Sequence, residues 1–252
     1  MLEVTKLCAG YGTDDVIRNI GFSAIKGESL CILGPNGSGK STLLRALARI
    51  INYRGSLTLD GQDMAALSRK DFAKKIAMMG QTINIFFPYT VSQCVSMGRY
   101  AHSKSFFKNL SAEDNIIVEN IMKKLDIWDI RRSMIDELSG GQMQRVFLAM
   151  TLAQEPDVIL LDEPTAHLDL KYQIDLFDFL KIWIKENNKI LISVFHDMNL
   201  ALRFSDTALV LNNGTLAANG KVEDVIKSKT LNDVFGVDVF NFMQKSLEMW
   251  GD

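Results

Sequence analysis

The residues best suited to chemistry form a glycine-rich run, Gly34-Pro35-Asn36-Gly37-Ser38-Gly39-Lys40-Ser41-Thr42. It fits the pattern of a glycine, four variable residues and then Gly-Lys-Ser. Its glycines let backbone N–H groups approach an anion with no side chain in the way. Lys40 would reach the β- and γ-phosphates of a nucleoside triphosphate, and the Ser41 hydroxyl would ligate Mg²⁺. The run therefore predicts a phosphate-binding loop.

Two carboxylates follow an apolar run in Asp157-Val158-Ile159-Leu160-Leu161-Asp162-Glu163-Pro164. A buried parallel strand has this composition, with its polar residues at the carboxyl end. Asp162 is placed to hold Mg²⁺ through water, and Glu163 to act as the general base or to orient the attacking water. The alternative is an acidic strand end that caps the next helix. Beside a phosphate-binding loop, the catalytic interpretation is favoured.

A second anion site is indicated at Leu138-Ser139-Gly140-Gly141-Gln142, hereafter the signature segment. Apolar residues follow it at the spacing of one helical face: Met143, Val146, Phe147 and Met150. We therefore expect a helix to begin near Gly140, with free N–H groups suited to an anion. Ser139 would also serve as its N-cap. One nucleotide does not obviously need two such sites.

These residues must be positioned by strands and helices that the sequence also indicates. The phosphate-binding loop follows an expected strand over Ser29–Leu33 and precedes an expected helix over Thr42–Ala48. Another buried strand, Lys189–Phe195, ends at His196, which should emerge at the sheet edge that carries Glu163. Further strands are expected at Leu2–Leu7, Ile20–Ile25 and Ser56–Leu59, and a hairpin at Thr207–Leu211 and Thr215–Ala218.

With both anion-binding motifs present, the chain resembles the ATP-binding cassette (ABC) ATPases over residues 2–220. The resemblance implies an α/β fold: a P-loop NTPase (RecA-like) core, an antiparallel β subdomain and an inserted α-helical subdomain. It divides a single domain, 1–252, into a nucleotide-binding core (1–81 and 147–220), a helical subdomain with the signature (82–146) and a tail (221–252). The tail would be a packed helix or a small dimer contact.

The resemblance also implies roles for residues of the nucleotide site. In the family, a histidine at the position of His196 contacts the γ-phosphate, and a glutamine at that of Gln81 senses Mg²⁺ and the attacking water. Tyr11 matches the aromatic that stacks on adenine. The run Pro164–Asp169, which contains His167, resembles the loop that links two ATP sites across a dimer, with Asp169 as its usual polar contact.

The same resemblance implies that two copies face head to tail. Each ATP would lie between the phosphate-binding loop of one chain and the signature segment of the other, where Ser139, Gly140, Gly141 and Gln142 contact it. The motifs occur once each in this chain, so it would be one half of the pair.

A weaker motif concerns the transported ligand. Phe87–Val91 followed by Val95–His102 is similar to the subgroup that serves iron–siderophore, haem and cobalamin importers, where this region borders the groove for a permease helix. From the residues alone, a surface loop and a short amphipathic helix are favoured. The resemblance implies an ATPase powering uptake through a separate membrane permease, with a solute-binding protein as an indirect partner. Gln93 and Cys94 depart from the residues frequent in this subgroup.

Composition limits the classes of function. The formal net charge is −2 and no basic cluster dominates, so nothing electrostatic argues for nucleic acid. Three scattered cysteines, Cys8, Cys31 and Cys94, fit a reducing cytosol. We see no signal peptide and no apolar run near the roughly 20 residues that cross a bilayer. We therefore expect a peripheral protein at the cytoplasmic face of the membrane.

Two alternatives remain within the family. One is a soluble ABC ATPase of translation or DNA repair, which usually carries two cassettes or a long insertion, and this chain has neither. The other is the ATPase of an exporter or lipid-transfer system. A nucleotide kinase is excluded, because its phosphate-binding loop is not accompanied by a Ser-Gly-Gly signature.

Overall fold

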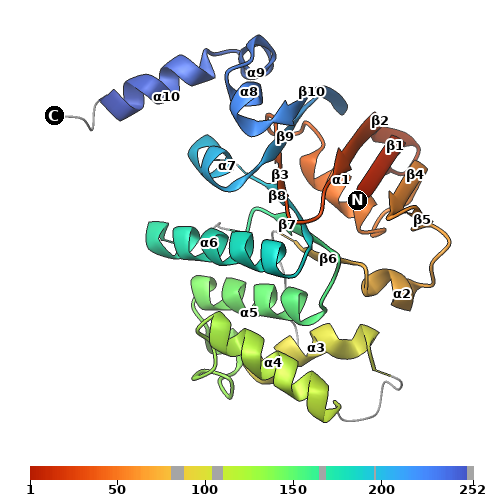
Figure 1. The fold of residues 1–252 in the computed structure, drawn as a ribbon, viewed down its shortest axis with the longest axis vertical. Helices are drawn as coiled ribbons and strands as arrows, with labels where there is room; N and C mark the ends of the chain where they lie inside the picture. The colour runs from red at the N-terminus through yellow and green to blue at the C-terminus, as the bar shows by residue number, and fades with distance from the viewer. Residues whose placement is uncertain (81–87, 104–109, 165–168, 196, 249–252) are drawn as a thin grey trace. The chain divides into compact units, whose positions relative to one another are not determined.

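The computed structural model describes residues 1–80, 88–103, 110–164, 169–195 and 197–248 (Figure 1). The chain divides into two compact units, Met1–Ala65 with Lys181–Asp252, and Ala66–Leu180. Helix α6, Leu170–Glu186, contains the boundary between them. The predicted subdomains, a core of 1–81 and 147–220, a helical subdomain of 82–146 and a tail of 221–252, have other boundaries than these two units. They stay a prediction.

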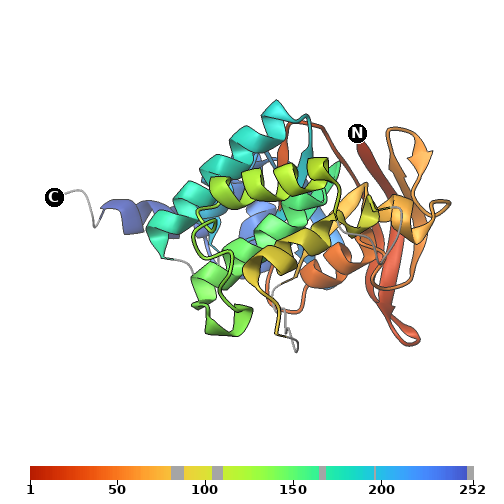
Figure 2. The ribbon, with the colours of Figure 1, turned by 90° about the horizontal axis from the view of Figure 1, so that it is seen from below.

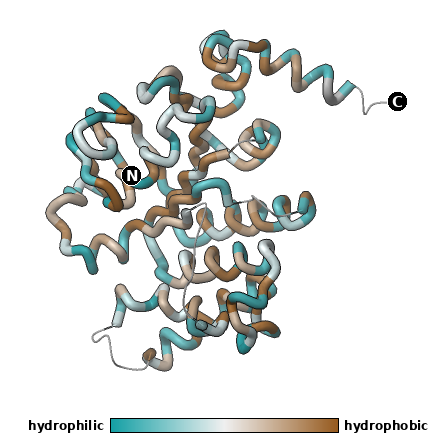
Figure 3. The backbone as a smooth tube through the Cα atoms, turned by 180° about the vertical axis from the view of Figure 1, so that it is seen from behind, coloured by the Kyte–Doolittle hydropathy of each residue, from teal (hydrophilic) through white to brown (hydrophobic). Residues whose placement is uncertain are grey.

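The first unit contains two groups of paired strands. An antiparallel sheet has the order β2-β1-β4-β5, from Asp14–Ala24, Leu2–Tyr11, Tyr53–Leu59 and Gln62–Asp63. A second set has the order β10-β9-β3-β8, from Thr215–Lys221, Thr207–Asn212, Ser29–Leu33 and Ile190–Val194. Strand β3 pairs in parallel with β8 and β9. All residues of β3 and β8 are buried, and Figure 3 shows hydrophobic residues along these strands.

The described residues of this unit also form five shorter helices besides the end of α6. They are α1 (Lys40–Leu47), α7 (Met198–Phe204), α8 (Val222–Ile226), α9 (Lys229–Phe235) and α10 (Val239–Glu248). The expected strands and the hairpin at Asn212–Gly214 are present, although β2 begins at Asp14 and not at the expected Ile20. The tail contains α8, α9 and α10 in its described residues, and its role stays a prediction.

The second unit combines a parallel strand pair with a helical layer. Strands β6 (Ile76–Met79) and β7 (Val158–Asp162) pair in parallel. Helices α3 (Val91–Met97) and α4 (Ala112–Lys124) both contact α5 (Gly140–Ala153), as Figures 1 and 2 show. Helix α2 (Arg69–Ala73) and the 3₁₀ helices η1 (Gly98–Ala101) and η2 (Ile135–Glu137) complete the unit. The predicted helical insertion between β6 and β7 is confirmed over the described residues.

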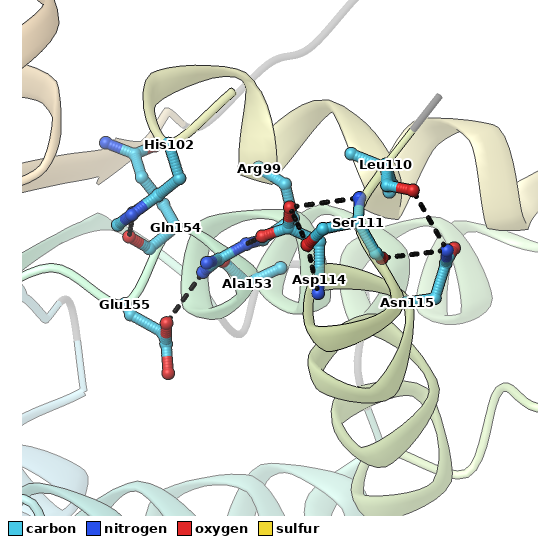
Figure 4. Close-up of polar contacts among 9 residues, drawn as sticks. All are labelled: Arg99, His102, Leu110, Ser111, Asp114, Asn115, Ala153, Gln154 and Glu155. Atoms are coloured by element: carbon cyan, nitrogen blue, oxygen red, sulfur yellow. Dashed lines mark hydrogen bonds and ion pairs between the residues drawn. The ribbon is translucent and has the colours of Figure 1, made fainter. Parts of the chain in front are cut away.

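A buried ion-pair cluster joins the helices of the second unit (Figure 4). Arg99 is 4% exposed, and its Nε donates to Asp114 Oδ1 at 2.7 Å. Its Nη1 donates to the Ala153 carbonyl and to Glu155 Oε2, each at 2.7 Å. Asp114 also accepts from Ser111 Oγ at 2.6 Å in the capping box of α4. The cluster therefore connects η1, the start of α4 and the end of α5.

Asp114 makes the stability of this unit sensitive to acid. Burial raises the pKa of the Asp114 carboxyl, but hydrogen bonds from Ser111 and Arg99 and the charge of Arg99 together lower it below 3.8. Because the unfolded chain takes up this proton first, the stabilisation is present above pH 3.8 and is lost as pH falls through the lower folded pKa.

We predict that Asp114→Asn lowers the free energy of unfolding by about 3 kcal/mol near neutral pH, because Arg99 loses its buried carboxylate. The difference from the wild type should shrink as pH falls below 3.8. Urea unfolding followed by circular dichroism at several pH values measures it. A difference that stays constant across this range would contradict the account.

Candidate functional site: a phosphate-binding loop and a second helix N-terminus

The phosphate-binding loop connects β3 to α1, as the sequence predicts. Gly34, Gly37 and Gly39 have positive φ angles of 146°, 78° and 102°. A Cβ on Gly34 would lie 2.3 Å from the Leu211 carbonyl oxygen, and one on Gly39 would lie 2.6 Å from Ile17 Cγ2. Only glycine meets both demands, a left-handed backbone and a close approach by its neighbours. The loop is thus fixed by β9 and β2 of its own unit.

Polar groups of this loop suit a polyphosphate. The ammonium of Lys40, a residue 6% exposed, donates to the carbonyl oxygens of Gly34 at 2.8 Å and Pro35 at 2.9 Å. Buried Ser38 Oγ has no hydrogen-bond partner among the described residues, so it can donate to an added oxygen. Helix α1 has no acidic residue in its first turn and no side-chain cap. Its N–H groups and positive dipole end therefore favour an anion.

Tyr11 lies in the same unit as the loop. It is 49% exposed and borders a groove of about 410 Å³ formed by the β1–β2 turn and residues Ile50–Arg54. Its hydroxyl accepts a hydrogen bond of 2.7 Å from Arg45 Nη1, and Arg45 belongs to α1. The ring therefore stays available for stacking while its hydroxyl is tied to the helix that follows the loop. This geometry is compatible with the predicted adenine contact.

The carboxylates that follow β7 lie in the second unit. Asp162 is 2% exposed at the end of a fully buried strand. Glu163 is half-buried and has φ = 53°, which is unusual for a residue other than glycine. Strand β7 ends at Asp162, and Glu163 is the next residue.

The signature segment forms the predicted helix start. Ser139 is the N-cap of α5, and its Oγ accepts from the Gln142 N–H at 3.3 Å while Gln142 Oε1 accepts from the Ser139 N–H at 3.0 Å. This capping box provides an acceptor for the backbone N–H of Gln142. The N–H groups of Gly140 and Gly141 have no intrahelical acceptor. The first turn of α5 contains no acidic residue. It is a second helix N-terminus suited to an anion.

A groove of about 520 Å³ brings the signature segment together with the start of α6. It is lined by Ser139–Gln142, Arg145, Asp169 and Tyr172. Asp169 Oδ1 accepts from the Tyr172 N–H at 3.0 Å, and the Arg145 guanidinium lies 4.9 Å from the centre of the Tyr172 ring. The sequence analysis does not predict Arg145 or Tyr172 as residues of this groove. Each lies three residues after a predicted site residue, Gln142 or Asp169, and this helical spacing could have indicated them.

Among the described residues, no group of three or more His, Cys, Asp or Glu side chains gathers in a metal site. The Ser41 hydroxyl in the first unit and the Asp162 carboxylate in the second unit are each oxygen donors of the kind that Mg²⁺ prefers. Three predicted residues, Gln81, His167 and His196, lie outside the described residues.

Residues 17–166 match the ABC transporter family. The chain belongs to the ABC transporter family. The iron(3+)-hydroxamate import ATP-binding protein FhuC of Bacillus subtilis is 37% identical over 94% of this chain and 88% of its own length. The ABC transporter ATP-binding protein YvrA of the same organism, named as uncharacterized, is 37% identical over 97% of this chain. The chain spans 56% of YvrA.

Solved structures agree with the fold. An ABC transporter assigned to the metal-chelate type, in an inward-facing conformation, aligns with a TM-score of 0.79 and 27% identity over 93% of this chain and 88% of its own. The dimeric structure of MJ0796, a bacterial ABC transporter cassette, aligns with a TM-score of 0.77 and 27% identity over 88% and 99%. The predicted ABC ATPase fold, the ATP-hydrolysing activity and the resemblance to iron-chelate importer subunits are confirmed.

We predict that Gly34→Ala lowers nucleotide affinity at least about tenfold, because moving the loop away from the Leu211 carbonyl costs about 1–3 kcal/mol. Titration with a fluorescent ADP analogue measures the affinity. Gly27→Ala is the matched control, since Gly27 has φ = 80° but open space around its Cβ position. Equal losses in both variants would contradict the account, because Gly27 lies outside the loop and an equal loss there would indicate general destabilisation.

Proposed function

We propose that the chain is the ATPase subunit of an importer for an iron chelate, haem or a cobalamin-like ligand. Two copies bind two ATP molecules head to tail, on the cytoplasmic face of a membrane permease. FhuC, named for iron(3+)-hydroxamate import, supports the ligand class, and the dimeric MJ0796 cassette supports the pairing. A solute-binding protein delivers the ligand to the permease. In the described residues, no helix has the length and hydropathy to cross a membrane.

The observation that carries the proposal is that a second helix, α5, begins at two glycines, Gly140 and Gly141, with an N-terminus suited to an anion. In a chain whose phosphate-binding loop already provides backbone N–H groups at α1, the signature segment supplies an equivalent set at α5. Both helix starts lack acidic residues and so attract phosphate. Placing the second set against the γ-phosphate held by another copy gives each site donors on both sides of the nucleotide.

Each remaining site residue then has a role in hydrolysis. Tyr11 stacks on adenine, and residues Gly34–Thr42 hold the phosphates. Glu163 orients the attacking water or accepts its proton, while His196 contacts the γ-phosphate and Asp169 contacts the partner's site. Ser41, Gln81 and Asp162 would hold Mg²⁺, which when bound offsets the charge of the β- and γ-phosphates. ATP binding thus closes the pair, and hydrolysis releases it.

We predict that Glu163→Gln slows hydrolysis by at least about 10²-fold while ATP binding persists, because the amide cannot accept the proton. The variant should accumulate as a dimer in saturating Mg-ATP and stay monomeric in Mg-ADP. Sedimentation velocity with both nucleotides measures it. Only monomer in Mg-ATP would contradict the head-to-tail arrangement.

The same variant tests the importer assignment in cells. Replacement of the native gene by the Glu163→Gln form should abolish uptake of one labelled ligand among ferric siderophores, haem and cobalamin. Cells that carry the Gly27→Ala form should import normally. Unchanged uptake of every ligand tested would favour an exporter or a soluble ATPase, even if the Mg-ATP dimer forms.

A further inference from the structure

The segment Gly98–His102 is fitted against the C-terminal end of helix α5. A Cβ on Gly98 would lie 2.2 Å from the Met150 carbonyl oxygen, so only glycine permits this approach. Arg99 Nη1 donates to the Ala153 carbonyl at 2.7 Å, and His102 Nε2 pairs with the Gln154 carbonyl at 2.9 Å (Figure 4). A carbonyl only accepts, so Nε2 carries the proton. These contacts satisfy carbonyls that the end of a helix leaves without partners.

Arg99 extends this contact to a second helix. The same guanidinium that binds Ala153 donates through Nε to Asp114, in the first turn of α4, and through Nη1 to Glu155. Its side chain is 5% exposed and that of Asp114 is 13% exposed. A planar guanidinium can serve acceptors in several directions, whereas the ammonium of lysine is a compact point charge. Its charge also suits the negative end of the α5 dipole.

A buried ion pair of this kind is weak evidence for added stability, since removing two charges from water offsets much of their attraction. Buried ion pairs are better known for selecting one arrangement of the helices or strands that they join. Here the joined elements are η1, the start of α4 and the end of α5. The other end of α5 is the signature segment.

We infer that Arg99 is a positioning residue that sets the direction of α5 and thereby places the signature segment. The inference rests on the proposed function, in which that segment completes a partner's ATP site. Helix α5 has 14 residues, so it is about 21 Å long, and a tilt of about 5° at its C-terminal end moves its N-terminus by roughly 2 Å. Misplacement by about 1 Å can cost on the order of 10²-fold in catalysis.

The test places Arg99→Lys in the Glu163→Gln background. Lysine keeps a positive charge beside Asp114 but loses the three-way contact, so the fold should persist. The ATP concentration for half-maximal dimerisation should rise at least about tenfold, because the signature segment is misplaced. The affinity of the monomer for a fluorescent ADP analogue should not change. His102→Leu, which removes only the contact to the Gln154 carbonyl, should shift the same midpoint by a smaller factor.

Lys123→Gln is the matched control, because it removes a cation paired with Glu119 at 2.6 Å on the same helix α4. It should leave the midpoint unchanged. An unchanged midpoint in Arg99→Lys overturns the inference, as does an equal loss of ADP affinity, which would indicate general unfolding. If Glu163→Gln alone stays monomeric, the proposed dimer is wrong and the inference falls with it.

Discussion

The proposed ATPase activity depends on the attraction between phosphate and the free N–H groups at a helix N-terminus. A helix leaves its first four N–H groups without partners, and its dipole places partial positive charge at the same end. Helices α1 and α5 each begin in this way, with no acidic residue in the first turn. In each case glycines clear the approach, Gly39 before α1 and Gly140 with Gly141 in α5.

The rest of each unit holds one of these helix ends in place. In the first unit, the phosphate-binding loop follows buried strand β3. The Leu211 carbonyl on β9 lies close to Gly34, and Ile17 on β2 lies close to Gly39. In the second unit, α3 and α4 pack on α5, and the Arg99 cluster fixes its far end.

The sequence predicts the local parts of this arrangement well. The strand before Gly34, the apolar run before Asp162 and the helix start at Gly140 are each encoded within about ten residues, by periodicity and glycine placement. Contacts between distant residues were missed. The sequence places His102 at the end of the subgroup motif Val95–His102, but it does not predict that the His102 ring bonds to the Gln154 carbonyl. Arg99 reaches Asp114 and Glu155, and no periodicity links those positions. Two residues of the subgroup motif Val95–His102, Arg99 and His102, therefore bond to other parts of the same unit.

The central claim is that the signature segment of one chain completes the ATP site of another. The most direct measurement is crosslinking between two tagged forms in a Cys8→Ala, Glu163→Gln background, where the remaining cysteines Cys31 and Cys94 are buried. One form carries Asn36→Cys in the phosphate-binding loop and the other carries Glu137→Cys beside the signature, both at exposed positions. A short bis-maleimide should join position 36 of one chain to position 137 of the other in Mg-ATP, and not in Mg-ADP. A dimer that forms in Mg-ATP without this crosslink, or that links only identical positions, would contradict the account.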